Sequence, residues 1–482
     1  MFDKNTKRSP EWLFSCGGAI EALIHKEMWA QTFSEVLNEA NTARSWLIVR
    51  KGKWASEYAL HSDLPEIFKV SEKFLDPDFL NIWLRSAHKA RLSFSKTVDN
   101  FGLQRLTNES ATKEWFETYL QIFRQIALHY WPSQPEFLYE PEQRLRALLA
   151  KTTKSEAELE DSLGLLTTPT EETIIDRENR ALSKLRKNIS EELLEKHARQ
   201  FPWLFLNTFN RETIHNFLLH RAQQKELYRE PNVDSRQDTR NKKREKLLQK
   251  IDTPEVENLS RLFRTMSIER LELKGRWAGA TYLFFRLFER IAEHVQTDVA
   301  DVLWTWRADE IREALTTRGF RVPKEETSRR LENYVLLLEK GALRFCSGNE
   351  ARQLIQRLLG KEIFADPAER QMRGMCASKG RVSGTVRVVR VESALALQED
   401  TDSFKKGEIM VVTMTQPSML PLIQKAAGVI TEEGGLTSHA TIICRERGIP
   451  CIVGVNSVTR TLHTGDNVVM DATKGIIDII QR

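Results

Sequence analysis

The sequence predicts a multidomain protein of the α + α/β class, with a large, mostly α-helical N-terminal region and a small α/β domain at the C-terminal end. Its 482 residues suggest two to four domains. All 11 Trp lie between Trp12 and Trp306, and all 7 Tyr lie between Tyr58 and Tyr334. Of the 22 Gly, 11 precede residue 371 and 11 follow it. The glycine-rich last part therefore lacks Trp and Tyr, which indicates two physically different regions.

Apolar side chains at helical spacing predict that most of the N-terminal region is α-helical. Between Trp277 and Val295, leucine and isoleucine recur every four residues, with charged residues on the other face. Leu331–Glu339 and Ala351–Leu359 continue this pattern, so both are predicted to be helices. Residues 46–58 are the exception, because two β-prone runs joined across a Lys-Gly pair predict a small β-hairpin.

Breaks in these patterns divide the chain into three expected parts. These are a helical region with the hairpin over residues 1–230, a second helical lobe over 231–365 and a C-terminal domain over 366–482. Helical periodicity is lost over Gly360–Arg373, a stretch that contains Pro367. We therefore expect a flexible connection there.

Composition and charge exclude several function classes. The net charge is +5, with 59 Lys and Arg against 56 Asp and Glu before residue 371 and 13 against 11 after it. Neither part is basic enough to indicate nucleic-acid binding. No apolar run reaches the roughly 18–20 residues that span a membrane, and we expect no secretory signal. The five cysteines lack CxxC spacing, which argues against a disulfide framework or zinc site and favours the cytoplasm.

From residue 374 the pattern changes to short β-prone runs separated by glycine turns. Two helices are expected among them, one over Pro417–Ala426 and one over about Ser438–Arg447, the second closed by Gly448. The runs predict strands at Gly384–Val391, Glu408–Thr413, Gly428–Thr431, Cys451–Val453, Asn467–Met470 and Ile476–Ile480.

The residues that could carry chemistry lie on one strand–turn–helix segment. The strand runs into Gly434-Gly435, where two glycines permit a tight turn and close approach of another group. Thr437 or Ser438 can cap the following helix, which places His439 in its first turn. The free amides and the helix dipole there favour negative charge, and histidine is a competent nucleophile. By spacing alone, His439 is either a phosphoryl carrier or a structural residue.

This segment resembles the mobile, or phosphohistidine, domain of phosphoenolpyruvate-utilising enzymes, a family that includes phosphoenolpyruvate synthase, pyruvate phosphate dikinase, enzyme I of the sugar phosphotransferase system and rifampin phosphotransferase. The matching landmarks are Gly434-Gly435, Ser438-His439-Ala440, Arg445-Glu446, Gly448-Ile449-Pro450 and Gly454. Further matches, among them Thr415-Gln416-Pro417, extend the resemblance over about 374–480. The resemblance implies that His439 is phosphorylated in transit, on a small β/β/α domain that swivels between a loading site and an unloading site.

The resemblance also concerns the neighbours of His439. Gly434, Gly435 and Ser438 would support the site. Arg445 would orient or neutralise the phosphate, or would serve only the end of the helix. Thr437 stands where pyruvate phosphate dikinases carry a regulatory threonine, although helix capping is the simpler explanation.

The sequence also departs from the family. Its members usually pair this domain with an ATP-grasp domain and often with a phosphoenolpyruvate-binding barrel, which needs about 250 residues. The region before residue 370 has no GxGxxG or P-loop motif, and nothing follows Arg482, so we expect neither domain in this chain. The order of a helical region followed by a phosphohistidine domain resembles the second half of rifampin-phosphotransferase-type enzymes, whose helical part holds the acceptor.

Two classes of function fit these patterns. The first is a dikinase-type phosphotransferase component, in which His439 takes a phosphoryl group from an ATP-grasp-type or phosphoenolpyruvate-binding partner and passes it to pyruvate or another small molecule. We expect no cofactor or metal in this chain, and magnesium-nucleotide only on the partner. His215 and His220 are candidates for acid–base help. The second is a non-catalytic binding or regulatory protein that keeps the swivelling domain as a docking module. The chain could also be half of a split enzyme.

Overall fold

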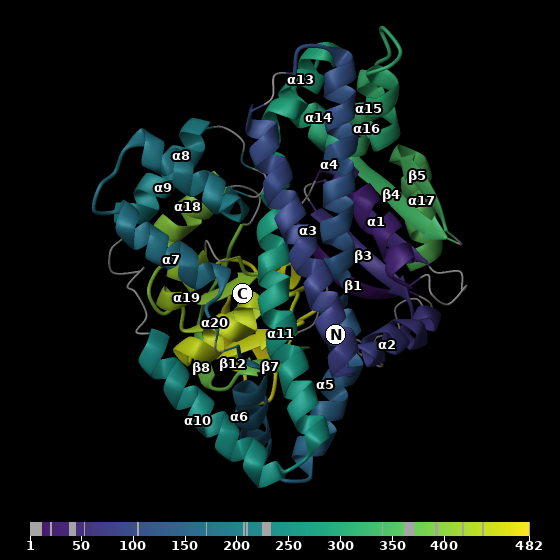
Figure 1. The fold of residues 1–482 in the computed structure, drawn as a ribbon. Coiled ribbons are helices and arrows are strands. Elements are labelled where there is room, and N and C mark those ends of the chain that lie inside the picture. Colours follow the sequence, from purple (N-terminus) through teal and green to yellow (C-terminus); the bar gives the residue numbers. More distant parts are fainter. Residues whose placement is uncertain are drawn as a thin grey trace.

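The computed structural model confirms the coarse architecture, with a mostly helical N-terminal region followed by a C-terminal sheet domain (Figure 1). It describes residues 12–19, 22–37, 45–52, 54–103, 106–169, 171–205, 208, 211–223, 233–339, 341–360, 371–390, 394–416, 419–435 and 438–481. We call residues 12–360 the helical region and residues 371–481 the sheet domain. No helix within the described ranges is both long and apolar enough to cross a membrane.

The longest helices of the helical region run side by side along its length (Figure 1). Its helices are α1 (Leu23–Leu37), α2 (Leu64–Lys73), α3 (Pro77–Leu103), α4 (Glu109–Tyr130), α5 (Pro135–Ala150), α6 (Glu156–Thr167), α7 (Ile174–Leu185), α8 (Glu191–Gln200), α9 (Arg211–Gln223), α10 (Val233–Ile251), α11 (Pro254–Trp277), α12 (Ala280–Leu283), α13 (Phe285–Val295), α14 (Val299–Thr305), α15 (Ala308–Ala314), α16 (Lys324–Glu332) and α17 (Gly348–Leu359). Helix α11 contacts α3, α4, α5 and α6, so it forms the centre of the helical packing.

An antiparallel sheet with the strand order β1-β3-β2-β4-β5 lies within the helical region. Its strands are β1 (Trp12–Ala19), β2 (Trp46–Lys51), β3 (Trp54–Leu60), β4 (Asn333–Glu339) and β5 (Ala342–Ser347). The β2–β3 pairing confirms the predicted hairpin, but β2 also pairs with β4, so the hairpin is part of a larger sheet. The sheet joins strands from both sides of the division expected near residue 230, and that division stays a prediction.

The predicted helix over Leu331–Glu339 is wrong, because α16 ends at Glu332 and the following residues form β4. Every residue from Asn333 to Leu338 is buried, and β4 contacts α1 and α17 as well as its neighbouring strands. A strand covered on both faces shows no polar alternation, so its sequence resembles a short buried helix. The helix predicted over Ala351–Leu359 is confirmed by α17.

The single helix expected between Trp277 and Val295 is interrupted. Helix α11 ends at Trp277, and two shorter helices, α12 and α13, cover most of the rest. A Cβ on Gly279 would lie 2.5 Å from Cβ of Pro202, so this glycine permits a close approach of two chain segments at the break. Helix α13 still has the predicted amphipathic pattern, with its leucine and isoleucine side chains buried.

The sheet domain contains an eight-stranded sheet with the order β6-β13-β12-β8-β9-β10-β11-β7. Strands β8, β9, β10 and β11 are parallel to one another, and the remaining pairs are antiparallel. The strands are β6 (Gln371–Arg373), β7 (Met375–Ser378), β8 (Arg381–Val388), β9 (Ile409–Val412), β10 (Gly428–Thr431), β11 (Cys451–Val453), β12 (Asn467–Asp471) and β13 (Ile476–Gln481). All the strands predicted after residue 380 are therefore present, with shifts of a few residues at their ends.

The two helices predicted in this domain correspond to α19 (Leu420–Lys425) and α20 (His439–Arg447). Helices α18 (Ala394–Ser403) and α21 (Val458–Thr461) were not predicted. The expected start of α19 at Pro417 lies outside the described residues, as does most of the connection expected near 360–373.

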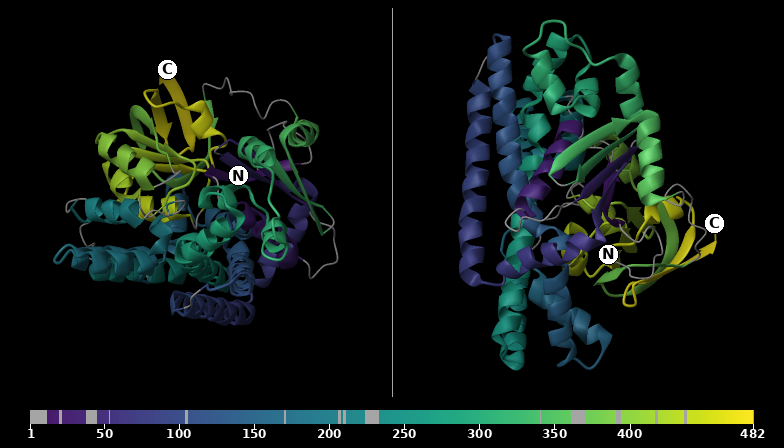
Figure 2. Two further views of the ribbon diagram at one scale, coloured as in Figure 1. Left: turned by 90° about the horizontal axis from the view of Figure 1, so that it is seen from above. Right: turned by 90° about the vertical axis from the view of Figure 1, so that its right-hand side faces the viewer.

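The sheet domain lies directly against the helical region (Figure 2). One continuous apolar core includes Trp277 and Phe284 from the helical region and Ile443 and Val453 from the sheet domain. Helix α18 contacts α9, and β7 contacts α6. This packing places the start of α20 beside α11.

Candidate functional site

Helix α20 begins at His439, as the sequence predicts, and Ser438 is its N-cap. Ser438 has extended backbone, and its Oγ accepts a hydrogen bond from the Thr441 amide at 3.3 Å. The preceding turn is tied to the same cap, since Gly435 O accepts from the Ser438 amide at 3.0 Å and from Thr441 Oγ1 at 2.8 Å. These bonds fix the direction in which the His439 side chain projects from the start of the helix.

The turn before α20 requires glycine at position 434. Gly434 has φ of 140°, and a Cβ there would lie 2.8 Å from Cβ of Val453 and 3.1 Å from Ser438 Oγ. Other residues rarely adopt this backbone conformation. Thr437, the other predicted cap, lies outside the described residues, so Ser438 is the cap that the structure describes.

The imidazole of His439 is buried, with 8% of its surface exposed. Its Nδ1 lies 2.9 Å from Oγ1 of Thr415, in the segment after β9. Nε2 is also buried, and it has no hydrogen-bond partner within the described part of the chain. When Nδ1–H donates to Thr415, Nε2 carries the free lone pair. One nitrogen is therefore held in place and the other is left unpaired.

Burial lowers the pKa of His439 to about 3, and the nearby positive charge of Lys274 lowers it further in the same direction. The imidazole is therefore neutral at pH 7, which is the form that acts as a nucleophile. An unpaired buried nitrogen costs free energy, so its presence in a folded core calls for an explanation.

Lys274 comes from α11 in the helical region. Its Nζ lies 3.5 Å from Sδ of Met414, the residue before Thr415. Lys274 and Gln416 line a small cavity together with the apolar side chains of Ile174 and Trp203. A cation of the helical region thus stands beside the imidazole of the sheet domain.

A second cation, Arg270, lies one helical turn before Lys274 on α11, on the same face of the helix. Arg270 hydrogen-bonds Tyr130 and lowers its pKa, although burial raises the pKa of this phenol overall. The carboxylate of Glu433, next to the glycine turn, acts on the same phenol. On α11, Lys274 therefore acts on His439, whereas Arg270 acts on Tyr130.

Arg445 lies at the opposite end of α20. Its Nε donates to the carbonyl oxygen of Ala377 at 2.6 Å, and its Nη1 donates to Oγ1 of Thr167 at 2.9 Å. No contact between Arg445 and His439 occurs among the described residues, and the predicted role of Arg445 toward a phosphate stays a prediction.

The two histidines considered for acid–base help have carboxylate neighbours. His215 Nε2 lies 3.3 Å from Glu195 Oε2, and His220 Nε2 lies 3.0 Å from Oδ1 of Asp402 in the sheet domain. The described contacts bring neither histidine to His439. No group of three or more His, Cys, Asp or Glu side chains in the described ranges is arranged to hold a metal ion.

Comparison with known proteins identifies the sheet domain. Residues 404–475 match the model of the phosphoenolpyruvate-utilising enzyme mobile domain. The sheet domain is a mobile domain of this family. Phosphoenolpyruvate synthase of Pyrococcus furiosus is 43% identical over 112 residues, which are 23% of this chain and 13% of the synthase. We call residues 371–481 the mobile domain from here on.

The similarity to another relative reaches beyond the mobile domain. The uncharacterised phosphotransferase YvkC of Bacillus subtilis is 29% identical over 206 residues, which are 42% of this chain and 24% of YvkC. The mobile domain spans only residues 371–481, so this match includes part of the helical region. The chain thus matches well under a third of the length of these relatives. A solved structure, the holo-form of aconitase X from Thermococcus kodakaraensis, aligns over 23% of this chain and all of that chain, with 18% identity and a TM-score of 0.18.

Sequence reasoning missed Lys274 and the pairing of His439 with Thr415. Thr415 stands in a family landmark, Thr415-Gln416-Pro417, which gave a signal for its position but not for its hydrogen bond. Lys274 lies on a helix of another region and carries no local signal, because only the packing of the mobile domain on α11 brings it to His439.

Proposed function

We propose that this chain is a phosphotransferase component that carries a phosphoryl group on His439. The group would come from a nucleotide-using partner of the ATP-grasp type or from a phosphoenolpyruvate-binding partner. It would pass to pyruvate or another small molecule held by the helical region. The observation that carries the proposal is the neutral, buried imidazole whose Nε2 has no hydrogen-bond partner among the described residues and lies beside Lys274.

The chemistry follows from the two nitrogens of the ring. In loading, the Nε2 lone pair attacks phosphorus, a P–N bond forms, and the bond from phosphorus to the donor's leaving oxygen breaks. In unloading, an acceptor oxygen attacks phosphorus, the P–N bond breaks, and its electron pair returns to Nε2. Thr415 Oγ1 keeps the ring oriented, since its hydrogen bond to Nδ1 is compatible with either step.

The surroundings of His439 suit the unloading step. Lys274 would neutralise charge that the phosphoryl oxygens carry during transfer. The capped start of α20 adds the positive end of the helix dipole at the same place. His439 is only 8% exposed in this arrangement, so loading by a separate protein requires the mobile domain to leave the helical region. We propose that magnesium and nucleotide act on the partner and that the protein works in the cytoplasm.

The test is phosphohistidine formation on the whole chain. Wild-type protein is incubated with cell lysate and ATP labelled in both its β- and γ-phosphates, and acid-labile, alkali-stable phosphate is located by mass spectrometry. We expect the label on His439 and none on H439A. A matched control is H463A, because His463 is an exposed histidine of the same domain.

Two results would contradict the proposal. Label that survives H439A would place the phosphate elsewhere. Complete absence of phosphohistidine from wild-type protein, with phosphoenolpyruvate also tried as donor, would favour a binding or regulatory protein that keeps the mobile domain for docking.

A further inference from the structure

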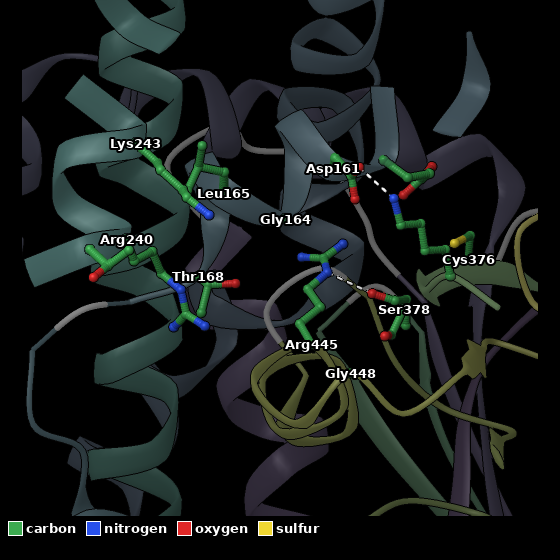
Figure 3. Close-up of a pocket in the computed structure, with 14 residues that line it drawn as sticks. Asp161, Gly164, Leu165, Thr168, Arg240, Lys243, Cys376, Ser378, Arg445 and Gly448 are labelled. Atoms are coloured by element: carbon green, nitrogen blue, oxygen red, sulfur yellow. Dashed lines mark hydrogen bonds and ion pairs between the residues drawn. The ribbon is translucent and has the colours of Figure 1, made fainter. Parts of the chain in front are cut away.

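The C-terminal end of α20 borders a cleft between the mobile domain and the helical region (Figure 3). Gly164 on α6 and Lys243 on α10 line one side, and Arg445 and Lys379 line the other. At the rim, Lys379 Nζ lies 2.5 Å from Asp161 Oδ2. Three polar contacts therefore join the two parts of the molecule at this cleft: this pair, the bond from Arg445 to Thr167, and the ion pair between Arg240 Nη1 and Glu446 Oε1 at 3.7 Å.

Arg445 lies within electrostatic range of a cluster of charges that belongs to the helical region. Arg146 lies 3.1 Å from Glu142 and 2.5 Å from Glu160, measured from guanidinium nitrogen to carboxylate oxygen, and both carboxylates are buried. Both also act electrostatically on Arg445. The helical region alone thus supplies two carboxylates and one guanidinium. The mobile domain supplies the second guanidinium, which balances the cluster.

Buried charge is stable only when it is paired and hydrogen-bonded, so this balance depends on contact between the two parts. Thr167, the hydroxyl acceptor for Arg445, is fully buried. A Cβ on Gly164 would lie 3.4 Å from Nε of Arg445, an ordinary van der Waals distance, so the Arg445 side chain lies directly against α6. The helical region therefore offers this side chain a buried hydroxyl acceptor and two nearby carboxylates.

The cluster also contains unmade bonds. Arg445 Nη2 and Glu160 Oε2 are both buried, and neither has a hydrogen-bond partner among the residues described. A donor and an acceptor of opposite charge are thus left over in the same cluster. Such a network is held less tightly than a fully paired core, which suits a contact that forms and breaks.

We propose that Arg445 is a positioning residue, which docks the mobile domain on the Glu142–Arg146–Glu160 cluster and so holds His439 beside Lys274. The two ends of helix α20 then have different roles. Its first residue, His439, takes part in phosphoryl transfer. Arg445, six residues later, determines the position of His439 relative to Lys274. The proposal deepens the proposed function and rests on it for its catalytic meaning.

The test measures docking without phosphorylation, on the whole unphosphorylated chain. Diethyl pyrocarbonate modifies accessible neutral imidazoles, and the buried Nε2 of His439 is protected when the mobile domain is docked. In R445M we expect modification of His439, read by mass spectrometry, to speed up about tenfold, the factor that corresponds to about 1.4 kcal/mol. The exposed His61 and His463 are internal references whose rates should not change.

A second substitution separates docking from a local folding defect. In R445M/E160Q the helical cluster is left with one carboxylate and one guanidinium, so its charge is balanced again, and we expect most of the protection of His439 to return. A defect confined to α20 would not respond to a change on α6. The matched control R387Q removes a cation whose partner, Glu408, lies within the mobile domain, and it should leave the rate unchanged.

Unchanged protection of His439 in R445M would overturn the proposal, as would a loss of protection that E160Q does not reduce. Neither result depends on whether His439 is ever phosphorylated. Failure of this docking role is therefore distinguishable from failure of the phosphotransfer proposal.

Discussion

Two regions of the molecule bury a histidine whose pKa is lowered to about 3, and of these two only His439 has a buried ring nitrogen without a hydrogen-bond partner among the described residues. In the core of the helical region, His25 Nε2 is hydrogen-bonded to Tyr119 OH, and its ring stacks on Phe123 at a centroid distance of 4.2 Å. At the start of α20, His439 has one bonded nitrogen, Nδ1, and one unpaired nitrogen, Nε2.

The difference shows what separates a structural histidine from a reactive one. Burial is the largest cause of the lowered pKa at both sites, and a neighbouring lysine adds to it at both, so the pKa does not distinguish them. The unpaired Nε2 of His439 does distinguish the two sites. A structural histidine gains stability from its bonds, whereas His439 keeps a lone pair unused at the expense of stability.

The largest expected difference between the two histidines is in phosphate labelling, and it is the strongest test of this comparison. H439A should lose the acid-labile phosphate entirely, while H25F should keep it at about the wild-type level, because phenylalanine retains the stacking on Phe123. Quantitative mass spectrometry of both variants after incubation with donor checks this. Equal labelling of the two variants would mean that the unpaired nitrogen does not mark the reactive histidine.

For the free energy of unfolding we expect the opposite order, with the larger loss at His25 and the smaller loss at His439. H25A removes a fully packed ring and one of the hydrogen bonds of the buried Tyr119 hydroxyl, which also bonds Thr281, so we expect a loss of about 3 kcal/mol in the free energy of unfolding. H439A also removes a buried ring and one hydrogen bond, but it removes the unpaired nitrogen with them, so the loss should be smaller, about 2 kcal/mol or less.

Urea titration followed by Trp fluorescence measures this contrast, since every Trp precedes residue 307 and the signal reports on the helical region. Losses of similar size in H25A and H439A would show that His439 is as structural as His25.

The sequence was sufficient for the parts of the site that one short segment determines. Gly434, Ser438 and His439 lie on a single strand–turn–helix unit, and the positive φ, the cap and the helix start are local properties of that unit. The strands of the mobile domain were predictable for the same reason, because glycine turns punctuate them.

What escaped prediction depends on contacts between distant segments. Strand β4 is covered on both faces, which erased the alternation that marks a strand. Lys274 reaches His439, and Arg445 reaches Thr167, only because the mobile domain packs on the helical region. The periodicity of a helix predicts which residues share a face, but it does not predict which other segment packs against that face.

Acid is expected to lower the stability of the folded chain at both histidines. Above pH 6.5 the imidazoles are neutral in both the folded and the unfolded chain, and the stability that depends on their neutrality is fully present. As the pH falls from 6.5 toward the folded pKa of about 3, the unfolded chain binds protons that the folded chain does not. Stability then falls by about 1.4 kcal/mol per pH unit for each histidine.

The two sites should respond to acid in sequence. His25 can be protonated only when the helical core opens, whereas His439 needs only the mobile domain to leave. We expect small-angle X-ray scattering to show expansion between pH 6 and 4 before Trp fluorescence reports unfolding, and H439A to reduce that early expansion. Expansion and unfolding at the same pH in both proteins would contradict this order.

The smallest expected effect is the change in the pKa of His439 when the single charge of Lys274 is removed. Lys274 is the second cause of the lowered pKa of His439, after burial, so K274M should raise that pKa while leaving it well below 6.5. The pKa of His25 should not move, because the cation near it is Lys26. Histidine ring-proton chemical shifts, followed by NMR as the pH is lowered, measure both in one sample. A pKa of His439 unmoved by K274M would remove Lys274 from the site, and an equal shift at His25 would point to a general change in the fold.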